Sequence, residues 1–244
     1  MTNEQENALN GCKITDKHII FWSSIFSNFY SEHGNKPLFS NSNGDWNTSE
    51  QYFMWLKADF FEDKDMADTI YQCDDPAVAK AYGRMVKPYD DKRWNSVRET
   101  KMYEAVYDKF TKNTFCRNLI LEKEFDGKTF VEGSPEDNIW GIGIIWNDPE
   151  ADDETKWRGT NRLGVVLDRV REKIVSDVRE KWIDPKVLLP DNSRNVLIYT
   201  EEGKEAEASY NPASNVWTQF RWSSQIVEPI AWREMPKFNN KMIK

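Results

Sequence analysis

The chain has 244 residues and a formal net charge of −8, from 33 lysines and arginines against 41 aspartates and glutamates. This length predicts one large domain or two unequal ones, with a core that needs no disulfide or metal support. Aromatic residues make up 14% of the chain, which is typical of a folded protein. The acidic balance disfavours a general nucleic-acid coat, whose affinity depends on phosphate neutralisation. Because the sequence has neither a long apolar run nor a secretory signal pattern, we expect a cytoplasmic protein.

The cysteines and histidines argue against several kinds of catalytic chemistry. Cys12, Cys73 and Cys116 are far apart, there are only two histidines, and no zinc or P-loop motif occurs. Carboxylates, lysines and arginines are therefore the expected catalytic groups, and we expect neither a metal nor another cofactor. The acidic stretch 148–154 is interpreted as a solvated loop, with a hard cation as the alternative.

The first fifth of the chain predicts short elements before a helix. Residues 1–16 are expected to form a flexible polar leader, and residues 17–47 short strands joined by loops. A helix should begin after Thr48, because Thr48 and Gln51 form a capping-box pattern.

Further helices are predicted downstream. Asp75 followed by a proline is typical of a helix start, and Gly83 of its end. Phe130 and Val131 indicate a short strand. Thr160 is the expected cap of the last helix. Longer helical patterns cover residues 94–112, 114–124 and 160–175.

The pattern changes to β-rich after about residue 180. A linker that contains two prolines precedes four short apolar segments, at residues 196–200, 207–210, 216–220 and 227–232. We therefore predict an α+β protein, with a compact, mainly helical domain over 17–180 and a small β-rich domain over 181–244.

Two groups of polar residues near the predicted helices could bind a substrate. Glu50 lies in a first helical turn and Lys57 two turns further on the same face, so the pair could frame a polar ligand. The alternative is a glutamate that only complements the helix dipole and a surface lysine. Arg84, after Gly83, could clamp a phosphate, and Trp94 could stack on a base. The alternative is a surface arginine and a core tryptophan.

A third group surrounds a pair of glycines. Asp137 precedes Trp140, and Gly141 and Gly143 would let the backbone approach a ligand closely. Asn161 is expected in the first turn of the last helix, where free N–H groups favour anions. The alternative is a turn with an aspartate cap, followed by an ordinary helix start.

The order of these motifs resembles the YbiA/NADAR superfamily over about residues 18–175. The resemblance implies a compact, mainly helical α+β fold and N-glycosidase activity. One branch of that family cleaves riboflavin-pathway intermediates, and another removes ADP-ribose from modified guanine or guanosine. The matching segments are Ser27-Asn-Phe29, Ser49-Glu-Gln-Tyr52 with Lys57-Ala58, Asp75-Pro76 with Ala79-Lys80, Gly83-Arg84, Trp94 with Arg98 and Met102, Lys109-Phe110, Glu132 with Asp137-x-x-Trp140-Gly-x-Gly143, and Gly159-x-Asn161-x-Leu163-Gly164.

The resemblance also assigns site residues. Glu50 matches the active-site glutamate of the family, Trp94 its substrate-stacking tryptophan, and Asp137 the acidic residue before Trp-Gly. Gln51 stands where some members have a histidine, which removes any help from an imidazole. The substrate-binding positions implied are Asn28, Lys57, Arg84, Trp94, Trp140, Gly141 and Asn161.

Together these observations predict a hydrolase that removes ADP-ribose from modified guanine or guanosine in nucleic acid or nucleotides. Glu50 would stabilise the sugar cation or activate water, and Asp137 would contact a ribose hydroxyl or act as its partner. Lys57 and Arg84 would meet phosphate. The alternatives are cleavage of a riboflavin intermediate, or of another phosphorylated ribosyl compound, and a non-catalytic module that binds ADP-ribose or a nucleotide. The tail loosely resembles a β-rich phage domain and assigns no chemistry.

Overall fold

The computed structural model describes residues 3–32, 36–180, 182–219 and 225–235. It divides the chain into two units, residues 1–172 and 173–244, which we describe separately. The division falls inside helix α7 (Arg162–Glu180), which runs past it without a break. The change in composition near residue 180 therefore follows the end of this helix rather than the division itself. Among the described residues, no helix has the length and apolar character needed to cross a membrane.

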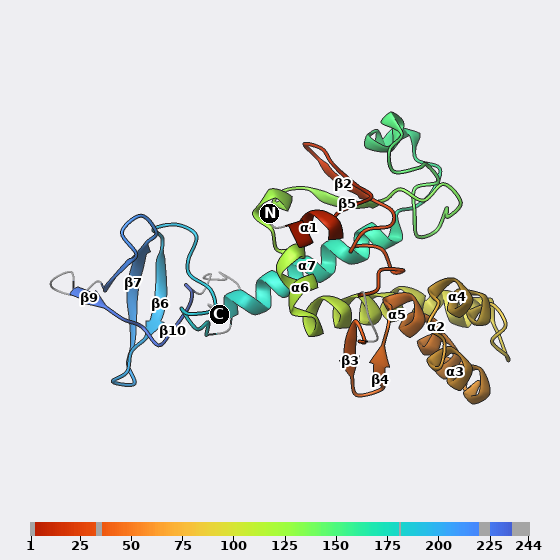
Figure 1. Ribbon diagram of the computed structural model, residues 1–244, viewed down its shortest axis with the longest axis horizontal. Helices are drawn as coiled ribbons and strands as arrows, with labels where there is room; N and C mark the ends of the chain where they lie inside the picture. The colour runs from red at the N-terminus through yellow and green to blue at the C-terminus, as the bar shows by residue number, and fades with distance from the viewer. Residues whose placement is uncertain (1–2, 33–35, 181, 220–224, 236–244) are drawn as a thin grey trace, which may run out of the picture. The chain divides into compact units, whose positions relative to one another are not determined.

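Unit 1 contains a three-stranded sheet of order β1-β2-β5, in which β2 and β5 run side by side (Figure 1). Strand β1 (Cys12–Ile14) is antiparallel to β2 (His18–Phe21), and β2 is parallel to β5 (Thr129–Glu132). Phe21 pairs with Glu132 at the carboxyl end of both strands. Because both chains leave the sheet at this edge, the loops that follow β2 and β5 lie close together.

The described residues before β2, from Asn3 onward, are also folded, which differs from the expected flexible leader. They form α1 (Asn3–Ala8) and β1. The N–H of Ile25 donates to the carbonyl of Ala8 at 2.8 Å, and the N–H of Trp22 donates to Gly11 at 3.1 Å. These bonds attach the start of the chain to the segment after β2.

Helix α2 is the centre of the helical part of unit 1 and packs against α3, α4 and α5. The predicted starts of α2 and α4 are confirmed: Thr48 accepts from the N–H of Gln51 at 3.0 Å, and Asp75 accepts from Ala77 at 2.7 Å. The amide oxygen of Gln51 accepts from Asn47, one residue before the expected cap. The bounds are α2 Ser49–Phe60, α3 Lys64–Tyr71, α4 Pro76–Gly83, α5 Asp91–Lys112, α6 Thr114–Ile120, a hairpin of β3 Phe39–Asn41 and β4 Gly44–Trp46, and three short 3-10 turns, Lys123–Phe125, Pro149–Asp152 and Glu154–Lys156.

A cluster of phenylalanines joins the sheet to the helices in the core of unit 1. The ring of Phe26 lies 4.7 Å from Phe130, 5.7 Å from Phe125 and 5.8 Å from Phe21. It also stacks on Phe110 of α5 at 6.3 Å. All five rings are buried, so the loop after β2 is fixed in place by its own anchor, Phe26.

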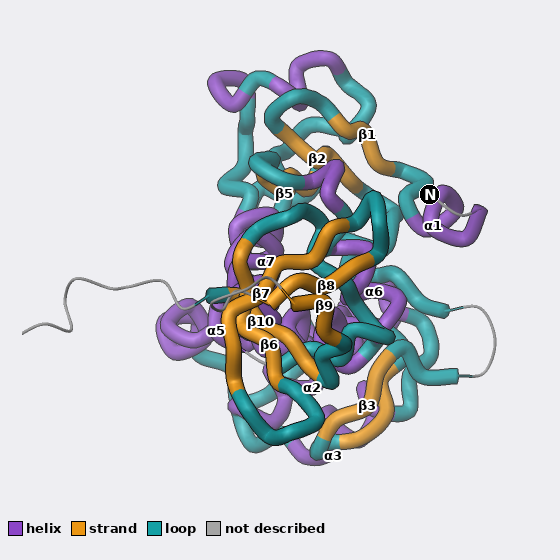
Figure 2. The backbone as a smooth tube through the Cα atoms, turned by 90° about the vertical axis from the view of Figure 1, so that its left-hand side faces the viewer, coloured by secondary structure: helices purple, strands orange, loops and turns teal. Residues whose placement is uncertain are grey.

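Unit 2 is built on a five-stranded antiparallel sheet of order β10-β6-β7-β8-β9, whose strands lie next to one another in Figure 2. Its buried core includes Val196, Ile198, Tyr210, Trp217 and Trp232. The segment predicted as one strand at 227–232 is two, because Pro229 cannot donate to a ladder. The α+β fold is thus confirmed, with strands β6 Asn195–Tyr199, β7 Glu205–Asn211, β8 Val216–Gln219, β9 Gln225–Val227 and β10 Ala231–Glu234.

Candidate active site

The loop after β2 holds Glu50 at the start of α2. The N–H of Glu50 donates to the carbonyl of Asn28 at 3.0 Å, and the hydroxyl of Ser49 donates to the side-chain oxygen of Asn28, also at 3.0 Å. The Asn28 side chain also hydrogen-bonds the carboxyl group of Glu50. Burial raises the pKa of Glu50 to about 7, although the charges of Lys80 and Arg84 oppose this rise. The site therefore contains a carboxyl group that titrates near neutral pH.

A second carboxyl group, on Glu132, ends strand β5. The side chain of Asn161 accepts from the N–H of Glu132 at 2.9 Å and donates to the carbonyl of Phe130 at 2.9 Å. The N–H of Ile142 donates to the carbonyl of Glu132 at 3.0 Å. The N–H and the carbonyl of Glu132 are consequently both bound, by the residue that precedes α7 and by the loop that follows β5.

The carboxyl group of Glu132 is itself poorly satisfied. Its Oε2 atom is buried, and no hydrogen bond reaches it from the residues that the structure describes. Burial raises the pKa of Glu132 to about 8; the negative charges of Asp137 and Glu50 add to this rise, and Lys80 opposes it. The neutral carboxylic acid is therefore the stable form at pH 7.

The third carboxyl group, Asp137, lies in the loop after β5. Its Oδ1 accepts from the backbone N–H groups of Ile139 at 3.0 Å and Trp140 at 2.8 Å. Its Oδ2 lies 3.8 Å from the Nζ of Lys80 on α4. A Cβ on Gly141 would lie only 3.0 Å from the carbonyl oxygens of Asp137 and Glu132, so a larger residue there would push this tight loop apart.

The structure thus brings together residues from four separate segments. Four of them are predicted for the site from the sequence. They are Glu50 from α2, Asp137 from the loop after β5, Asn28 from the loop after β2 and Arg84 from the end of α4. Arg84 is exposed and acts on Glu50 through its charge.

Two residues of this cluster were not assigned to the site from the sequence. Lys80 lies one helical turn before Arg84, a spacing that places both cations on one face of α4. Glu132 directly follows the apolar strand residues Phe130 and Val131, and a polar residue at the carboxyl end of a parallel strand was the signal that could have found it.

Lys57 has partners of its own away from these carboxyl groups. Its Nζ donates to the carbonyl of Gly83 at 2.7 Å and lies 4.4 Å from the ring of Tyr89. Burial and the charge of Arg84 lower its pKa. The ammonium of Lys57, although it comes from α2, thus complements the dipole at the C-terminus of α4. Contact between Lys57 and a phosphate stays a prediction.

Trp94 lies in an aromatic layer behind the cluster. It is 7% exposed and packs against Phe53 at 5.5 Å, and against Phe60 and Phe61. Phe53 in turn meets the half-buried Trp140 edge-on at 5.5 Å. Trp94 thus supports Trp140 through Phe53, and direct stacking of Trp94 on a substrate stays a prediction.

Helix α7 begins two residues later than predicted. Asn161 has a left-handed φ of 49°, outside the helix, and both polar atoms of its side chain bind strand β5. The hydroxyl of Thr160 donates to the carbonyl of Ile139 at 2.7 Å. The expected cap and anion site are therefore replaced by a link between α7 and the strand that carries Glu132.

The acidic stretch 148–154 is tied to a buried histidine. Asp152 accepts from the hydroxyl of Thr15 at 2.7 Å and lies 2.9 Å from Nδ1 of His18. Glu154 lies 3.2 Å from Nε2 of the same ring. Throughout the described ranges, no three His, Cys, Asp or Glu side chains gather closely enough to hold a metal.

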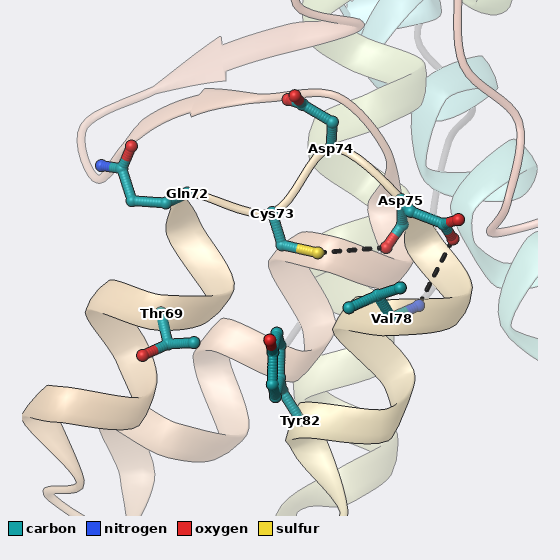
Figure 3. A pocket seen from close by; sticks show the side chains of 7 residues that line it. All are labelled: Thr69, Gln72, Cys73, Asp74, Asp75, Val78 and Tyr82. Atoms are coloured by element: carbon teal, nitrogen blue, oxygen red, sulfur yellow. Dashed lines mark hydrogen bonds between the residues drawn. The ribbon is translucent and has the colours of Figure 1, made fainter.

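A pocket of about 500 Å³ lies beside the ends of α3 and α4, and none of the three carboxyl groups lines it (Figure 3). The Sγ of Cys73 donates to the carbonyl of Asp75 at 3.3 Å, and Asp75 caps α4. These hydrogen bonds stabilise the turn between α3 and α4. The lining residues are Thr69, Gln72, Cys73, Asp74, Asp75, Val78 and Tyr82.

Comparison with known proteins agrees with this architecture. Residues 20–175 match the NADAR domain family. The chain is 35% identical to protein irg-1 of Caenorhabditis elegans over 66% of its own length and 81% of that protein. It is 31% identical to an N-glycosidase of Acanthamoeba polyphaga mimivirus over 65% of its length and 97% of the relative. The NMR structure of YbiA from Escherichia coli superposes with a TM-score of 0.53 at 28% identity, covering 70% of this chain and 92% of that one.

These likenesses place the chain in a known class. The protein belongs to the NADAR domain family, as its motifs indicated. The Escherichia coli relative, 31% identical over 60% of this chain and 87% of its own length, is named N-glycosidase YbiA. Like the named relatives, this protein is an enzyme, a hydrolase that acts on N-glycosyl compounds.

Proposed function

We propose that this enzyme removes ADP-ribose from modified guanine or guanosine, in nucleotides or in nucleic acid. The observation that carries the proposal is the position of Glu50. Its carboxyl group is buried in the first turn of α2, hydrogen-bonded to Asn28 and close to the charges of Lys80 and Asp137. Cleavage of an N-glycosidic bond leaves a positively charged sugar, which a buried carboxylate stabilises more strongly than an exposed one.

Glu50 is also suited to activate the attacking water. A general base works best when its pKa lies near the working pH, and the pKa of Glu50 is about 7. Asp137 would contact a ribose hydroxyl. Its Oδ1 is occupied by two backbone donors, so Oδ2, the atom that faces Lys80, is the one offered to the substrate.

The binding groups around the carboxyl cluster fit a phosphorylated ribosyl compound. Trp140 is half-buried, and its ring can hold the base while Phe53 and Trp94 support it from behind. Arg84 is exposed beside Glu50 and offers a fork of donors for a phosphate, and the ammonium of Lys57, from α2, lies next to it at the carbonyl of Gly83.

A product assay with three substrates tests this proposal. ADP-ribosylated guanosine, ADP-ribosylated DNA and a riboflavin-pathway intermediate are incubated separately with the enzyme, and released base and sugar are quantified by mass spectrometry. We expect free ADP-ribose from the first two. Release only from the riboflavin intermediate would favour the other branch of the family. Binding of ADP-ribose that raises Tm without any product from the three substrates would identify a binding module and refute the proposal.

A further inference from the structure

Glu132 differs from the other two carboxyl groups of the site in its hydrogen bonds. Glu50 is bonded by the side chain of Asn28, and Asp137 by two backbone N–H groups. The buried Oε2 of Glu132 receives no hydrogen bond within the described part of the chain. A buried carboxylate without donors is costly, whereas a carboxylic acid in the same place is not.

The charges around Glu132 also favour the neutral form. Two acids face it, Glu50 from α2 and Asp137 from the loop after β5, and one cation, Lys80 from α4. Burial raises the pKa of both Glu132 and Glu50, to about 8 and about 7, and the charge of Glu50 adds to the rise for Glu132, so the proton is favoured on Glu132 when Glu50 is charged. Environments that separate two carboxyl groups in this way assign acid and base roles.

The position of Glu132 is fixed by the fold. Its N–H and carbonyl are bound by Asn161 and Ile142. It is the last residue of β5, which pairs in parallel with β2. The residue as a whole is only half-buried, so part of it remains accessible beside Glu50 and Asp137. A proton held by a side chain whose backbone is fixed, next to the other carboxyl groups of the site, is what a general acid requires.

We propose that Glu132 is the general acid that protonates the departing base, a role that rests on the proposed N-glycosidase reaction. As the bond between the sugar carbon and the base nitrogen breaks, its electron pair moves to the base, and the base takes the proton of Glu132. Water then attacks the sugar carbon and gives its proton to the carboxylate of Glu50. The products are free ADP-ribose and the unmodified guanine or guanosine. Glu50 then loses its proton to solvent and Glu132 takes one up from solvent.

This role defines the class of base that the site can release. A purine or pyrimidine nitrogen leaves poorly as an anion and well as a neutral molecule, so protonation lowers the barrier to cleavage. Protonation of the leaving group then requires the neutral form of Glu132, and activation of water requires the charged form of Glu50. Activity should therefore rise as pH approaches about 7 and fall as it passes about 8.

The test compares Glu132→Gln with Glu136→Gln on ADP-ribosylated guanosine across a range of pH. Glu136 is an exposed carboxylate in the same loop, so its variant is expected to retain wild-type kcat and pH profile. Glu132→Gln keeps the size of the side chain but cannot supply the proton. We expect kcat to fall by about a hundredfold or more, and the fall in activity above pH 8 to disappear.

Two results would overturn the proposal. Glu132→Gln could keep wild-type kcat, or it could lose activity while its residual rate still falls above pH 8, which would indicate a structural role. Should Glu132→Gln fail to fold, Glu132→Asp replaces it. Because aspartate can still supply a proton, we expect a reduced kcat and an activity that still falls above pH 8. If wild-type enzyme releases nothing from ADP-ribosylated guanosine, the proposed substrate is wrong, and the same comparison is made on a riboflavin-pathway intermediate.

Discussion

Glu50, Glu132 and Asp137 bring three acidic groups toward a single lysine, Lys80. Burial raises the pKa of Glu50 to about 7 and that of Glu132 to about 8, so the cluster retains a proton at neutral pH. The different bonding of each group decides where that proton resides. This division of roles is a property of individual atoms, because the backbone of the three residues is ordinary helix, strand and loop.

Replacing Glu50, the proposed general base, should abolish turnover without unfolding the protein. Glu50→Gln keeps the length of the side chain and the hydrogen bond that the backbone N–H of residue 50 donates to the carbonyl of Asn28. We expect kcat to fall by at least about a hundredfold and Tm to change little. Asp59→Asn, an exposed change on the same helix, is the control. Wild-type turnover by Glu50→Gln in the product assay would contradict the role of this residue.

The stability of the protein should depend on pH through Glu132. Folding raises the pKa of this group from 4.5 to about 8. The stability contributed by the neutral carboxyl is fully present below pH 4.5 and is lost as pH rises through about 8. Glu132→Gln stays neutral, so its free energy of unfolding should match wild type at pH 4 and exceed it at pH 9 by on the order of 2 kcal/mol. Equal Tm values for the two proteins at pH 9 would show that the carboxyl is better solvated than its burial implies.

The sequence predicts part of this site. Glu50 and Asp137 are indicated by short motifs, because each acid lies within a few residues of a helix start or a glycine pair. Glu132 and Lys80 carry only weak local signals, the end of an apolar strand and a one-turn spacing from Arg84, and their convergence depends on long-range packing of β5, α4 and α2. For Lys57 the seven-residue spacing predicts the same helix face as Glu50, but it gives no sign of the carbonyl of Gly83 that accepts from the Lys57 ammonium.

At the scale of secondary structure, Asn161 connects α7 to the strand that ends in Glu132. We expect Asn161→Ala to lower the free energy of unfolding by about 3 kcal/mol, from two buried hydrogen bonds and a left-handed φ that alanine adopts poorly. Asn161→Gly loses the same bonds without the strain, so its loss should be smaller by about 1 kcal/mol. Urea unfolding of both variants measures the difference. An equal loss in the two variants would mean that backbone strain at this residue is negligible.

The helices with strong caps are those that the sequence predicts best. α2 and α4 begin after Thr48 and Asp75, whose side chains bind the first free N–H groups whatever the rest of the fold does. α3 is missed because its apolar side is short, with only Ala67 and Ile70 buried. The start of α7 is misplaced because tertiary bonds from Asn161 to β5 override the local preference at Thr160.

At the scale of the whole chain, we expect the catalytic function to reside in the first part. A shortened chain of residues 1–180 keeps α7 intact and contains the full family match over residues 20–175. The sheet of unit 2 has a buried core of its own, which suits a separate folding unit. Product release by residues 1–180 should therefore be comparable to that by the full chain. A shortened chain that folds but is inactive would show that the tail contributes to substrate capture or to the site.

Activity should survive exhaustive chelation. The chemistry proposed here uses carboxyl groups for both proton transfers, and the described residues offer no cluster of metal-binding side chains. Treatment with EDTA followed by dialysis should leave kcat unchanged. Complete loss of activity that one divalent ion restores would mean that a carboxyl group of the site serves as a metal ligand.

Strand β5 lies at the end of the three-stranded sheet, yet its outer side is not open. Asp168 accepts from the N–H of Phe130 at 3.2 Å, Asn161 binds the carbonyl of Phe130 and the N–H of Glu132, and Ile142 donates to the carbonyl of Glu132. An unpaired strand edge invites pairing with a second molecule. Here a primary amide, a carboxylate and a loop take the place of the missing neighbour. The strand that carries the proposed acid is thereby protected from edge-to-edge self-association as well as positioned for catalysis.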